Sequence, residues 1–312
     1  MKRKTLKMVE VSRSGFVEST HYGVAILINS SGEILREWGN SNTLIYPRSA
    51  LKPIQSLNLY RDGIAEALNL SDDFIALTTA SHHAENIHQK MINNWLKKIN
   101  IKENYLSCGP SWPWNIKDQF KAHIKYKVKR KIFHNCSGKH CGHLAVSLHK
   151  NLPIKNYQHK DHPIQKDLIK LIEDLSKYKI KNIGVDGCTL PNPLIPLKKF
   201  TFAIAQLADY KKLNEHSTIA KRIFDSCVKF PEITGGNKSI NSILIAFVAS
   251  LFLSCLKRLF NSVSLSSALT LLSIKMPRTK IPKSFFIYKG VISKVLIKKS
   301  ATAFLTFLAA SF

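Results

Sequence analysis

The chain has 312 residues, of which 45% are hydrophobic and 9% aromatic, a composition that excludes collagen-like, low-complexity and wholly disordered proteins. Its length is sufficient to bury a large core in one or two domains. The formal net charge of +27 comes from 38 lysines and only 9 arginines spread along the chain, whereas nucleic-acid-binding proteins gather arginine on one face. We therefore expect a globular protein that does not bind nucleic acid.

No segment of the sequence resembles a membrane or export signal. No apolar run reaches the roughly 18 residues of a spanning helix, and the charged opening Met1–Glu10 lacks the apolar core of a secretory signal. Six cysteines in a chain of this length indicate reduced thiols rather than a disulfide framework. The sequence thus predicts a cytoplasmic protein without a membrane partner.

The elements predicted along the chain mix strands with helices. In chain order they are a hairpin of strands at 22–28 and 33–38, a helix from Ser49, a strand at 74–78, a helix at 84–99, a helix at 164–175, a strand at 182–185 and a helix at 203–224. Pro53 fits a helix only in or next to its first turn, which places the helix start at Ser49. The mixture predicts an α/β fold of the α+β sandwich type.

One tight basic cluster, Lys125–Lys131, alternates lysines with Tyr126 and Val128. Such alternation is typical of the solvated face of an edge strand, and it would also suit a nucleic-acid contact. We favour the edge strand, because the remaining basic residues do not extend the cluster into a patch.

The composition changes abruptly after Gly235-Gly236. Residues 241–312 contain ten Lys or Arg, no Asp or Glu and a single glycine, Gly290, which is unusual for a natural globular domain. The apolar stretch Ile243–Leu256 is too short to span a bilayer. Three interpretations stay open, namely a buried helix of a second lobe, a membrane-surface tail, and a segment translated out of frame.

A serine and a lysine lie three residues apart at a predicted helix start, in Pro47-Arg48-Ser49-Ala50-Leu51-Lys52-Pro53. This spacing puts both side chains on one helix face. A lysine whose pKa is lowered by burial can take the proton of a serine hydroxyl and make it a nucleophile, as in the Ser-x-x-Lys motif of β-lactamases and penicillin-binding proteins. The alternative is an N-cap serine beside a solvated lysine.

A second polar segment, Thr78-Thr79-Ala80-Ser81-His82-His83-Ala84-Glu85, lies where the predicted strand meets the helix at 84–99. Helix N-termini attract anions, so the segment is a candidate for contacts to a substrate carboxylate or an oxyanion. From the segment alone we favour the simpler interpretation, helix capping by Ser81 or Thr79.

Two cysteines and three histidines lie within ten residues in His134–His143, and Cys188 follows in Val185-Asp186-Gly187-Cys188. This density indicates a soft-metal site with one ligand from another segment, although the spacing is not that of a zinc finger. Buried thiols that pack as small hydrophobic side chains explain the pattern equally well. The other cysteines, Cys108, Cys227 and Cys255, are predicted to be structural.

Taken together and in order, these motifs resemble one family. They are Pro47-Arg48-Ser49-x-x-Lys52-Pro53, Ala80-Ser81-His82, His134-Asn135-Cys136-Ser137-Gly138-Lys139-His140, Val185-Asp186-Gly187-Cys188, and Pro231-Glu232 before Gly235-Gly236. The set resembles the rhizobial-type, thermolabile L-asparaginases, the asparaginase II family, over about residues 8–236. The Asn-Cys-Ser-Gly-Lys-His string is the most specific part of the resemblance.

The resemblance implies a serine-β-lactamase-like fold and hydrolysis of the side-chain amide of L-asparagine to L-aspartate and ammonia. The roles that it implies are Ser49 as nucleophile, Lys52 as its base, Ser81 as a second active-site serine, Cys136, Lys139 and Cys188 as zinc ligands, and Arg48, His140 and Asp186 around the substrate pocket. A lysine must be neutral to bind zinc, so the site is expected to lower the pKa of Lys139. L-asparagine is then the expected small-molecule partner, and a homodimer is expected.

The resemblance ends at the Gly-Gly pair. The family continues with a Thr-Gly-Arg stretch and with glycine-rich strands that carry a further catalytic lysine, whereas Gly236 is followed here by Asn237-Lys238-Ser239. We therefore divide the chain into a catalytic domain at 1–236 and a non-matching segment at 237–312. A frameshift near codon 237 would explain the joint loss of family pattern, acids and glycines, and would leave the sheet without its C-terminal strands.

Two other functions stay open from the residues alone. The Ser-x-x-Lys motif is shared with penicillin-recognising acyl-enzymes, although no Ser-Asp-Asn or Lys-Thr-Gly motif follows it. The cysteine and histidine cluster would also suit a non-catalytic, basic metal-binding protein. Labelling by a chromogenic β-lactam would favour the first alternative, and steeply salt-dependent nucleic-acid binding the second.

Overall fold

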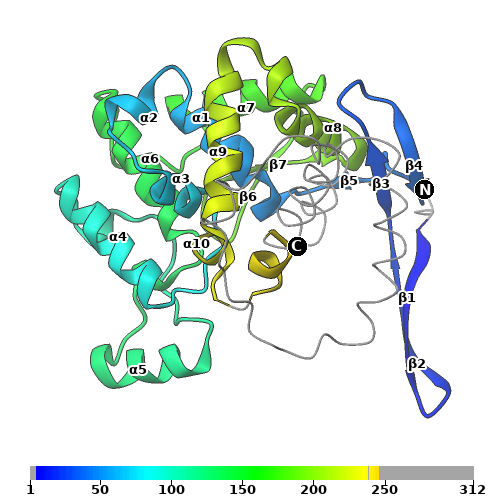
Figure 1. Cartoon of the computed structure of the whole chain (residues 1–312), viewed down its shortest axis with the longest axis horizontal. Helices are drawn as coiled ribbons and strands as arrows, with labels where there is room; N and C mark the ends of the chain where they lie inside the picture. The colour runs from blue at the N-terminus through cyan, green and yellow to red at the C-terminus, as the bar shows by residue number, and fades with distance from the viewer. Residues whose placement is uncertain (1–4, 238, 246–312) are drawn as a thin grey trace, which may run out of the picture.

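The structure, a computed structural model, describes residues 5–237 and 239–245 (Figure 1). The strands are β1 (Leu6–Arg13), β2 (Phe16–Gly23), β3 (Ala25–Ile28), β4 (Ile34–Trp38), β5 (Leu44–Ile45), β6 (Ile183–Val185), β7 (Pro191–Pro193) and β8 (Ile195–Pro196). The α-helices are α1 (Lys52–Tyr60), α2 (Ile64–Ala67), α3 (Asp72–Thr79), α4 (Asn86–Lys98), α5 (Ile116–Tyr126), α6 (Ser137–His149), α7 (Pro163–Ser176), α8 (Leu197–Ala208), α9 (Ser217–Lys229) and α10 (Pro231–Gly235). The predicted mixture of helix and sheet is confirmed; the serine-β-lactamase-like arrangement stays a prediction.

The antiparallel pairs β1–β2 and β3–β4 lie along one edge of the helical body, whereas the pair β6–β7 lies nearer its middle (Figure 1). β3 and β4 form the predicted hairpin, whereas Tyr22 and Gly23 belong to β2 instead. Asn29 closes the turn, because its side-chain oxygen accepts hydrogen bonds from the backbone of Ser31 (3.1 Å) and Glu33 (2.9 Å). The turn sequence thus sets the hairpin, as predicted.

The core lies among α1, α3, α6 and α7. α1 packs against the other three helices, and α3 also packs against α6 and α9. The fully buried side chains include Ile54, Leu57, Ile75, Leu77 and Trp95, each of which stabilises the fold by about 1.5–3 kcal/mol through removal of apolar surface from water. The helices predicted from Ser49, at 84–99 and at 164–175 are confirmed as α1 with its preceding turn, α4 and α7. None of the helices in the described ranges is both long and apolar enough to cross a bilayer.

Three predicted elements are wrong. Residues 74–78 belong to α3, because a short apolar run suits a buried helix as well as a strand. The helix predicted at 203–224 is two helices, α8 and α9, since the chain turns between them at Asn214, whose φ is +48°. The basic cluster at 125–131 is not an edge strand: α5 ends at Tyr126, and Lys127 adopts a left-handed conformation that stops the helix.

Most of the segment at 237–312 lies outside the described residues. Residues 240–245 are helical, and the Ser242 hydroxyl is 2.7 Å from the carbonyl oxygens of both Pro231 and Gly236. The frameshift and the division at residue 236 therefore stay predictions. Cys255 and residues 246–256 of the predicted apolar stretch fall outside the described ranges.

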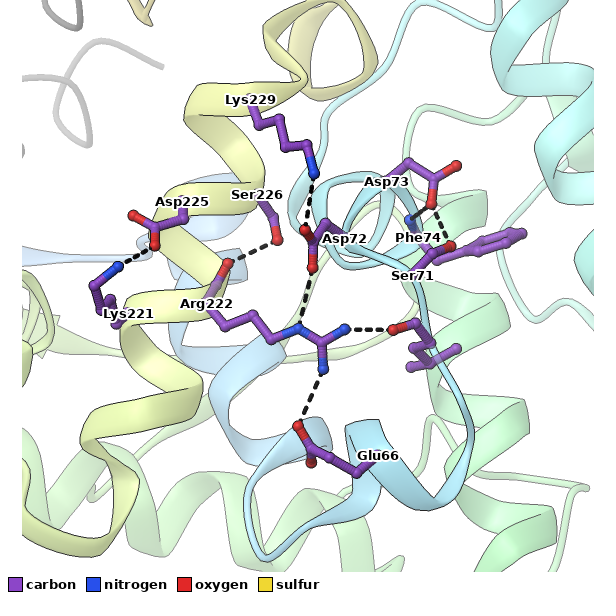
Figure 2. A network of polar contacts seen from close by, with 11 residues as sticks. Glu66, Ser71, Asp72, Asp73, Phe74, Lys221, Arg222, Asp225, Ser226 and Lys229 are labelled. Carbon is purple, nitrogen blue, oxygen red and sulfur yellow. Dashed lines mark hydrogen bonds and ion pairs between the residues drawn. The ribbon is translucent and has the colours of Figure 1, made fainter. Parts of the chain in front are cut away.

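Arg222 joins α9 to α2 and α3, as Figure 2 shows. Its guanidinium donates hydrogen bonds to Glu66 and Asp72, both at 3.1 Å, and to the carbonyl oxygen of Leu70. Truncation would remove the donor of Glu66 and of the Leu70 carbonyl oxygen, and would leave Asp72 paired with Lys229 alone (3.2 Å). We expect Arg222→Ala to lower the free energy of unfolding by about 1.5–3 kcal/mol, measured by urea denaturation.

The matched control is Lys221, one residue earlier on α9. Lys221 forms an exposed ion pair with Asp225, one helical turn away (Figure 2). Lys221→Ala should change the free energy of unfolding by no more than about 0.5 kcal/mol, because exposed pairs are solvated. Equal stabilities of the two variants would show that the Arg222 contacts contribute nothing measurable.

Candidate active site

Lys52 lies at the start of α1 with its side chain enclosed by the protein. The 3₁₀ turn Arg48–Leu51 leads into α1, and Pro53 lies in the first turn, as predicted. The Lys52 amine donates hydrogen bonds to the carbonyl oxygen of Ala80 (2.5 Å) and to the hydroxyl of Ser81 (2.7 Å). Burial lowers the pKa of Lys52, which is what an amine that accepts a proton requires.

Ser81 lies in a loop between the helices α3 and α4, not between a strand and a helix. The residue that caps α4 is Glu85: its carboxylate accepts a hydrogen bond from the backbone of His88, and the His88 ring accepts one from the backbone of Glu85. The predicted capping by Ser81 or Thr79 is therefore wrong. The Ser81 hydroxyl is directed to Lys52 instead.

Ser49, the predicted nucleophile, is half-buried in the turn that precedes Lys52. Within the described residues, the hydroxyl that the Lys52 amine contacts is that of Ser81, not that of Ser49. The hydrogen-bond partner of the amine thus comes from another segment of the chain, and the helix-start spacing alone did not identify it.

Cys136, Lys139 and Cys188 meet beside Lys52, although they come from distant segments. Cys136 immediately precedes α6, Lys139 lies in its first turn, and Cys188 follows β6. All three are buried, and the Lys139 amine lies 3.4 Å from the Cys188 sulfur. A hydrogen bond from Cys188 holds the pKa of the Cys136 thiol well below its usual value against the effect of burial, and the two lysine amines add to this lowering.

The structure does not show the expected lowering of the Lys139 pKa. Burial lowers the pKa of this amine, but the neighbouring Cys136, Cys188 and Asp186 raise it by more, so its pKa lies above the usual value. A cation that bound the Lys139 nitrogen would therefore have to displace its proton.

Arg48 and Asp186 border the cluster on its exposed side. The Arg48 side chain donates to one Asp186 oxygen (3.0 Å), and the backbone of Cys188 donates to the other (3.3 Å). The Arg48 backbone donates to the side chain of Asn192 (3.2 Å). Burial raises the pKa of Asp186, but the hydrogen bonds from Cys188 and Arg48 leave it below its usual value, so the carboxylate is charged. An exposed guanidinium beside this carboxylate is a suitable contact for a zwitterionic ligand.

His140 is buried, and its hydrogen bond leads away from Lys52. Its Nδ1 lies 2.6 Å from the Tyr157 hydroxyl, and its Nε2 has no partner among the described residues. Burial holds the pKa of His140 well below the usual value, so the ring is neutral. Nothing in the sequence around Tyr157 signals this contact.

A second contact that the sequence did not indicate ties the Ser81 loop to α6. The ring of His82, next to Ser81, lies 3.0 Å from the Ser137 hydroxyl, and both side chains are buried. His82 belongs to the Ala80-Ser81-His82 motif and Ser137 to the Asn-Cys-Ser-Gly-Lys-His string, but nothing in either motif indicated that the two side chains meet.

His88 makes the stability of the fold depend on pH. Its Nδ1 accepts from the backbone of Glu85, and its Nε2 faces the carbonyl oxygens of Glu232 (3.2 Å) and Ile233 (3.1 Å). Burial lowers the pKa of His88 from 6.5 to about 4. Between these pH values the unfolded state binds more protons than the folded state, so we expect stability to fall by up to about 3 kcal/mol as the pH falls through this range.

Denaturant unfolding at pH 7 and pH 5 tests this expectation. His88→Gln keeps one donor and one acceptor but does not titrate, so it should lose less stability than the wild type between these pH values. The exposed His149→Gln is the matched control and should behave as the wild type. A loss in His88→Gln as large as that of the wild type would contradict the assignment.

The side chains of Cys136, Lys139 and Cys188 form a set of donor atoms that is compatible with a metal site. Two sulfur atoms and one amine nitrogen converge from Cys136, Cys188 and Lys139, and thiolates are ligands that zinc prefers. No group of three or more His, Cys, Asp or Glu side chains within residues 5–237 and 239–245 is placed to hold a metal ion. The third donor atom that lies beside the two sulfur atoms is the Lys139 nitrogen. All five cysteines in the described ranges are free thiols.

The structure is thus that of a mixed helix and sheet protein with an enclosed lysine, serine and thiol cluster. A sequence model described as L-asparaginase II matches residues 9–254, about four-fifths of the chain. The chain therefore belongs to the L-asparaginase II family, which confirms the resemblance found in its motifs and indicates an amidohydrolase that acts on a small molecule. The match extends beyond residue 236, where the resemblance was predicted to end. A comparison with curated proteins gives no match.

Proposed function

We propose that this chain hydrolyses the side-chain amide of L-asparagine to L-aspartate and ammonia through a serine activated by Lys52. The observation that carries the proposal is the enclosed Lys52 amine, whose hydrogen bond to the Ser81 hydroxyl is 2.7 Å long. A lysine in water is charged and cannot accept a proton at neutral pH, whereas burial lowers the pKa of Lys52. Membership of the L-asparaginase II family supplies the substrate class.

In the proposed reaction the Ser49 hydroxyl attacks the amide carbon of asparagine, and neutral Lys52 takes its proton. The protonated amine then gives this proton to the leaving nitrogen, so that ammonia departs and an aspartyl ester of Ser49 remains. Water, deprotonated by the same amine, then attacks the ester carbon. The bond to the Ser49 oxygen breaks, and this oxygen takes the proton back from Lys52, so that L-aspartate leaves and both the serine hydroxyl and the neutral amine are restored. Ser81 holds the Lys52 amine toward the reacting groups through its hydrogen bond.

Arg48 and Asp186 are the proposed contacts for the charged end of the substrate. The Arg48 guanidinium is exposed, so it can bind a carboxylate, and Asp186 can accept hydrogen bonds from an ammonium group. His140 would border this pocket as a neutral ring. These roles suit L-asparagine, which carries both a carboxylate and an ammonium group.

Cys136, Lys139 and Cys188 are the proposed zinc ligands. A bound zinc ion would add positive charge beside Lys52 and orient polar groups of the substrate. Metal analysis of the purified chain tests this part of the proposal. Cys188→Ser should lose zinc, whereas Cys227→Ser on α9 should keep it; zinc retained in Cys188→Ser would contradict the ligand set.

Ammonia release from L-asparagine by the purified chain tests the reaction. Ser49→Ala is expected to abolish release, because no ester can form, and Ser81→Ala to reduce kcat by about 10²-fold or more, as loss of a group that assists proton transfer does. Ser147→Ala, a buried serine of α6 without a partner among the described residues, is the matched control. Mass spectrometry of the trapped ester identifies the serine, and an ester on Ser81 would reverse the two roles.

We also propose that the non-matching segment at 237–312 impairs this activity. The further catalytic lysine that the resemblance implies has no match after Gly236. Reading the nucleotide sequence in the other two frames tests the frameshift near codon 237. A glycine-rich continuation would support it, and its absence from both frames would contradict it.

A further inference from the structure

α5 carries an exposed apolar row that repeats every four residues. Ile116, Phe120, Ile124 and Val128 are between 59% and 75% exposed, although large hydrophobic side chains are ordinarily buried. The first three lie on consecutive turns of α5, and Val128 follows just beyond its end. Ile116, Phe120 and Ile124 thus form one apolar row on the helix rather than scattered exposure, and Val128 lies beyond the left-handed turn at Lys127.

A row of lysines follows the apolar row one position later. Lys117, Lys121, Lys125 and Lys129 each come directly after one of the apolar residues, and Lys127 adds a fifth charge. Asp118 is the one acidic residue in the segment 116–129. Within the described residues, none of these lysines forms an ion pair. The charges are therefore available to an external partner.

The opposite face of α5 holds the helix against the protein. Ala122 is buried, and Tyr126 packs edge-on against Phe133. His123, which lies beside Ile116 and Phe120 rather than opposite them, stacks on Trp112 with ring centroids 3.6 Å apart and also fixes the helix. Figure 1 shows α5 at the periphery of the molecule, beyond α4. The two exposed rows are thus presented outward on a fixed helix.

We propose that α5 is a docking surface for an anionic membrane surface. A helix with apolar and aromatic residues along one face and lysines beside them lies in the plane of a lipid interface, with its apolar side chains among the acyl chains and its lysines at the anionic headgroups. Trp114, two residues before α5, is also exposed, and its indole, one face of which stacks on His83, is a side chain that prefers this interface. The proposal departs from the sequence-based expectation of no membrane partner.

Charge complementarity favours an anionic lipid over the other occupants. A second copy of α5 across a twofold axis would bring lysine rows together with few acids to neutralise them. The chain's own residues 241–312 contain no Asp or Glu, so they offer no complementary charge. Nucleic acid would leave the aliphatic side chains unused, and the neighbouring Arg130 is already paired with Glu103.

Sedimentation of the full chain with vesicles tests the proposal. The wild type should bind vesicles of phosphatidylcholine and phosphatidylglycerol more tightly than vesicles of phosphatidylcholine alone. Changing the α5 lysines to glutamine (K117Q, K121Q and K125Q together) should weaken binding about 100-fold. Changing the apolar row to serine (I116S, F120S and I124S together) should weaken it at least about tenfold, because apolar burial is lost.

The matched control is a triple variant of exposed lysines, K166Q and K170Q on α7 and K177Q directly after it, which removes the same charge and should bind as the wild type. Far-UV circular dichroism verifies that all variants fold. Undiminished vesicle binding by both α5 variants would overturn the proposal. So would a change in oligomeric state caused by the apolar variant, or DNA binding that depends on the lysines while vesicle binding is absent.

Insertion depth provides an independent measurement. Brominated phosphatidylglycerol should quench the part of the tryptophan emission that W114F removes, because Trp114 would lie at the lipid interface. Quenching that is identical in the wild type and in W114F would place another part of the chain on the vesicle and would overturn the assignment to α5.

Discussion

Replacing Lys52 with methionine should lower kcat for asparagine hydrolysis by about 10²–10⁴-fold, the contribution of a positioned general base. The variant removes the amine that contacts Ser81 and keeps an unbranched side chain of similar length. Stability should fall by about 1–3 kcal/mol, because the buried Ala80 carbonyl oxygen loses its donor. Steady-state kinetics and thermal unfolding of the purified variant measure the two effects.

Lys131 is the matched control for Lys52. Like Lys52, it donates two hydrogen bonds through its amine. Both go to backbone carbonyl oxygens, those of Asn104 (2.9 Å) and Leu106 (2.6 Å), and neither goes to a hydroxyl. Lys131→Met should therefore leave kcat close to the wild-type value. An equal loss of activity in both variants, or none in Lys52→Met, would show that the Lys52 amine does not take part in the reaction.

Gly138→Ala is expected to have the second large effect. An added methyl group would lie 2.6 Å from the Leu77 carbonyl oxygen and 2.7 Å from the Leu77 side chain. α6 approaches α3 closely at this glycine, so the helix would have to move away, at a cost of about 1–3 kcal/mol in the free energy of unfolding. The movement would carry Cys136 and Lys139 with it, and both activity and zinc content should fall.

Gly109 serves as the control for this substitution. A methyl group on Gly109 would have no atom within 4 Å, so Gly109→Ala should leave stability unchanged or raise it slightly. Chemical denaturation and metal analysis of both variants make the comparison. A Gly138→Ala chain with wild-type stability and activity would show that α6 can shift at no cost to the site.

Local signals in the sequence were sufficient for several elements. The turn residues from Asn29 to Gly32 predict the hairpin, Pro53 places a helix start, and apolar spacing predicts α4, because each depends on neighbours within a few positions. The same signals failed for residues 74–78. Five apolar or hydroxyl-bearing residues in a row satisfy a buried helix and a buried strand equally, and only packing against α6 and α9 decides between them.

The sequence by itself determined the family of this protein and the residues to examine, because motif order is carried along the chain. Only the tertiary structure decided which of these residues touch. Lys52 reaches Ser81 across 29 positions and Lys139 reaches Cys188 across 49. Such contacts depend on how α1, α3 and α6 pack together, and no local spacing encodes that packing. The pKa of Lys52 falls for the same reason, since burial is a property of the folded chain.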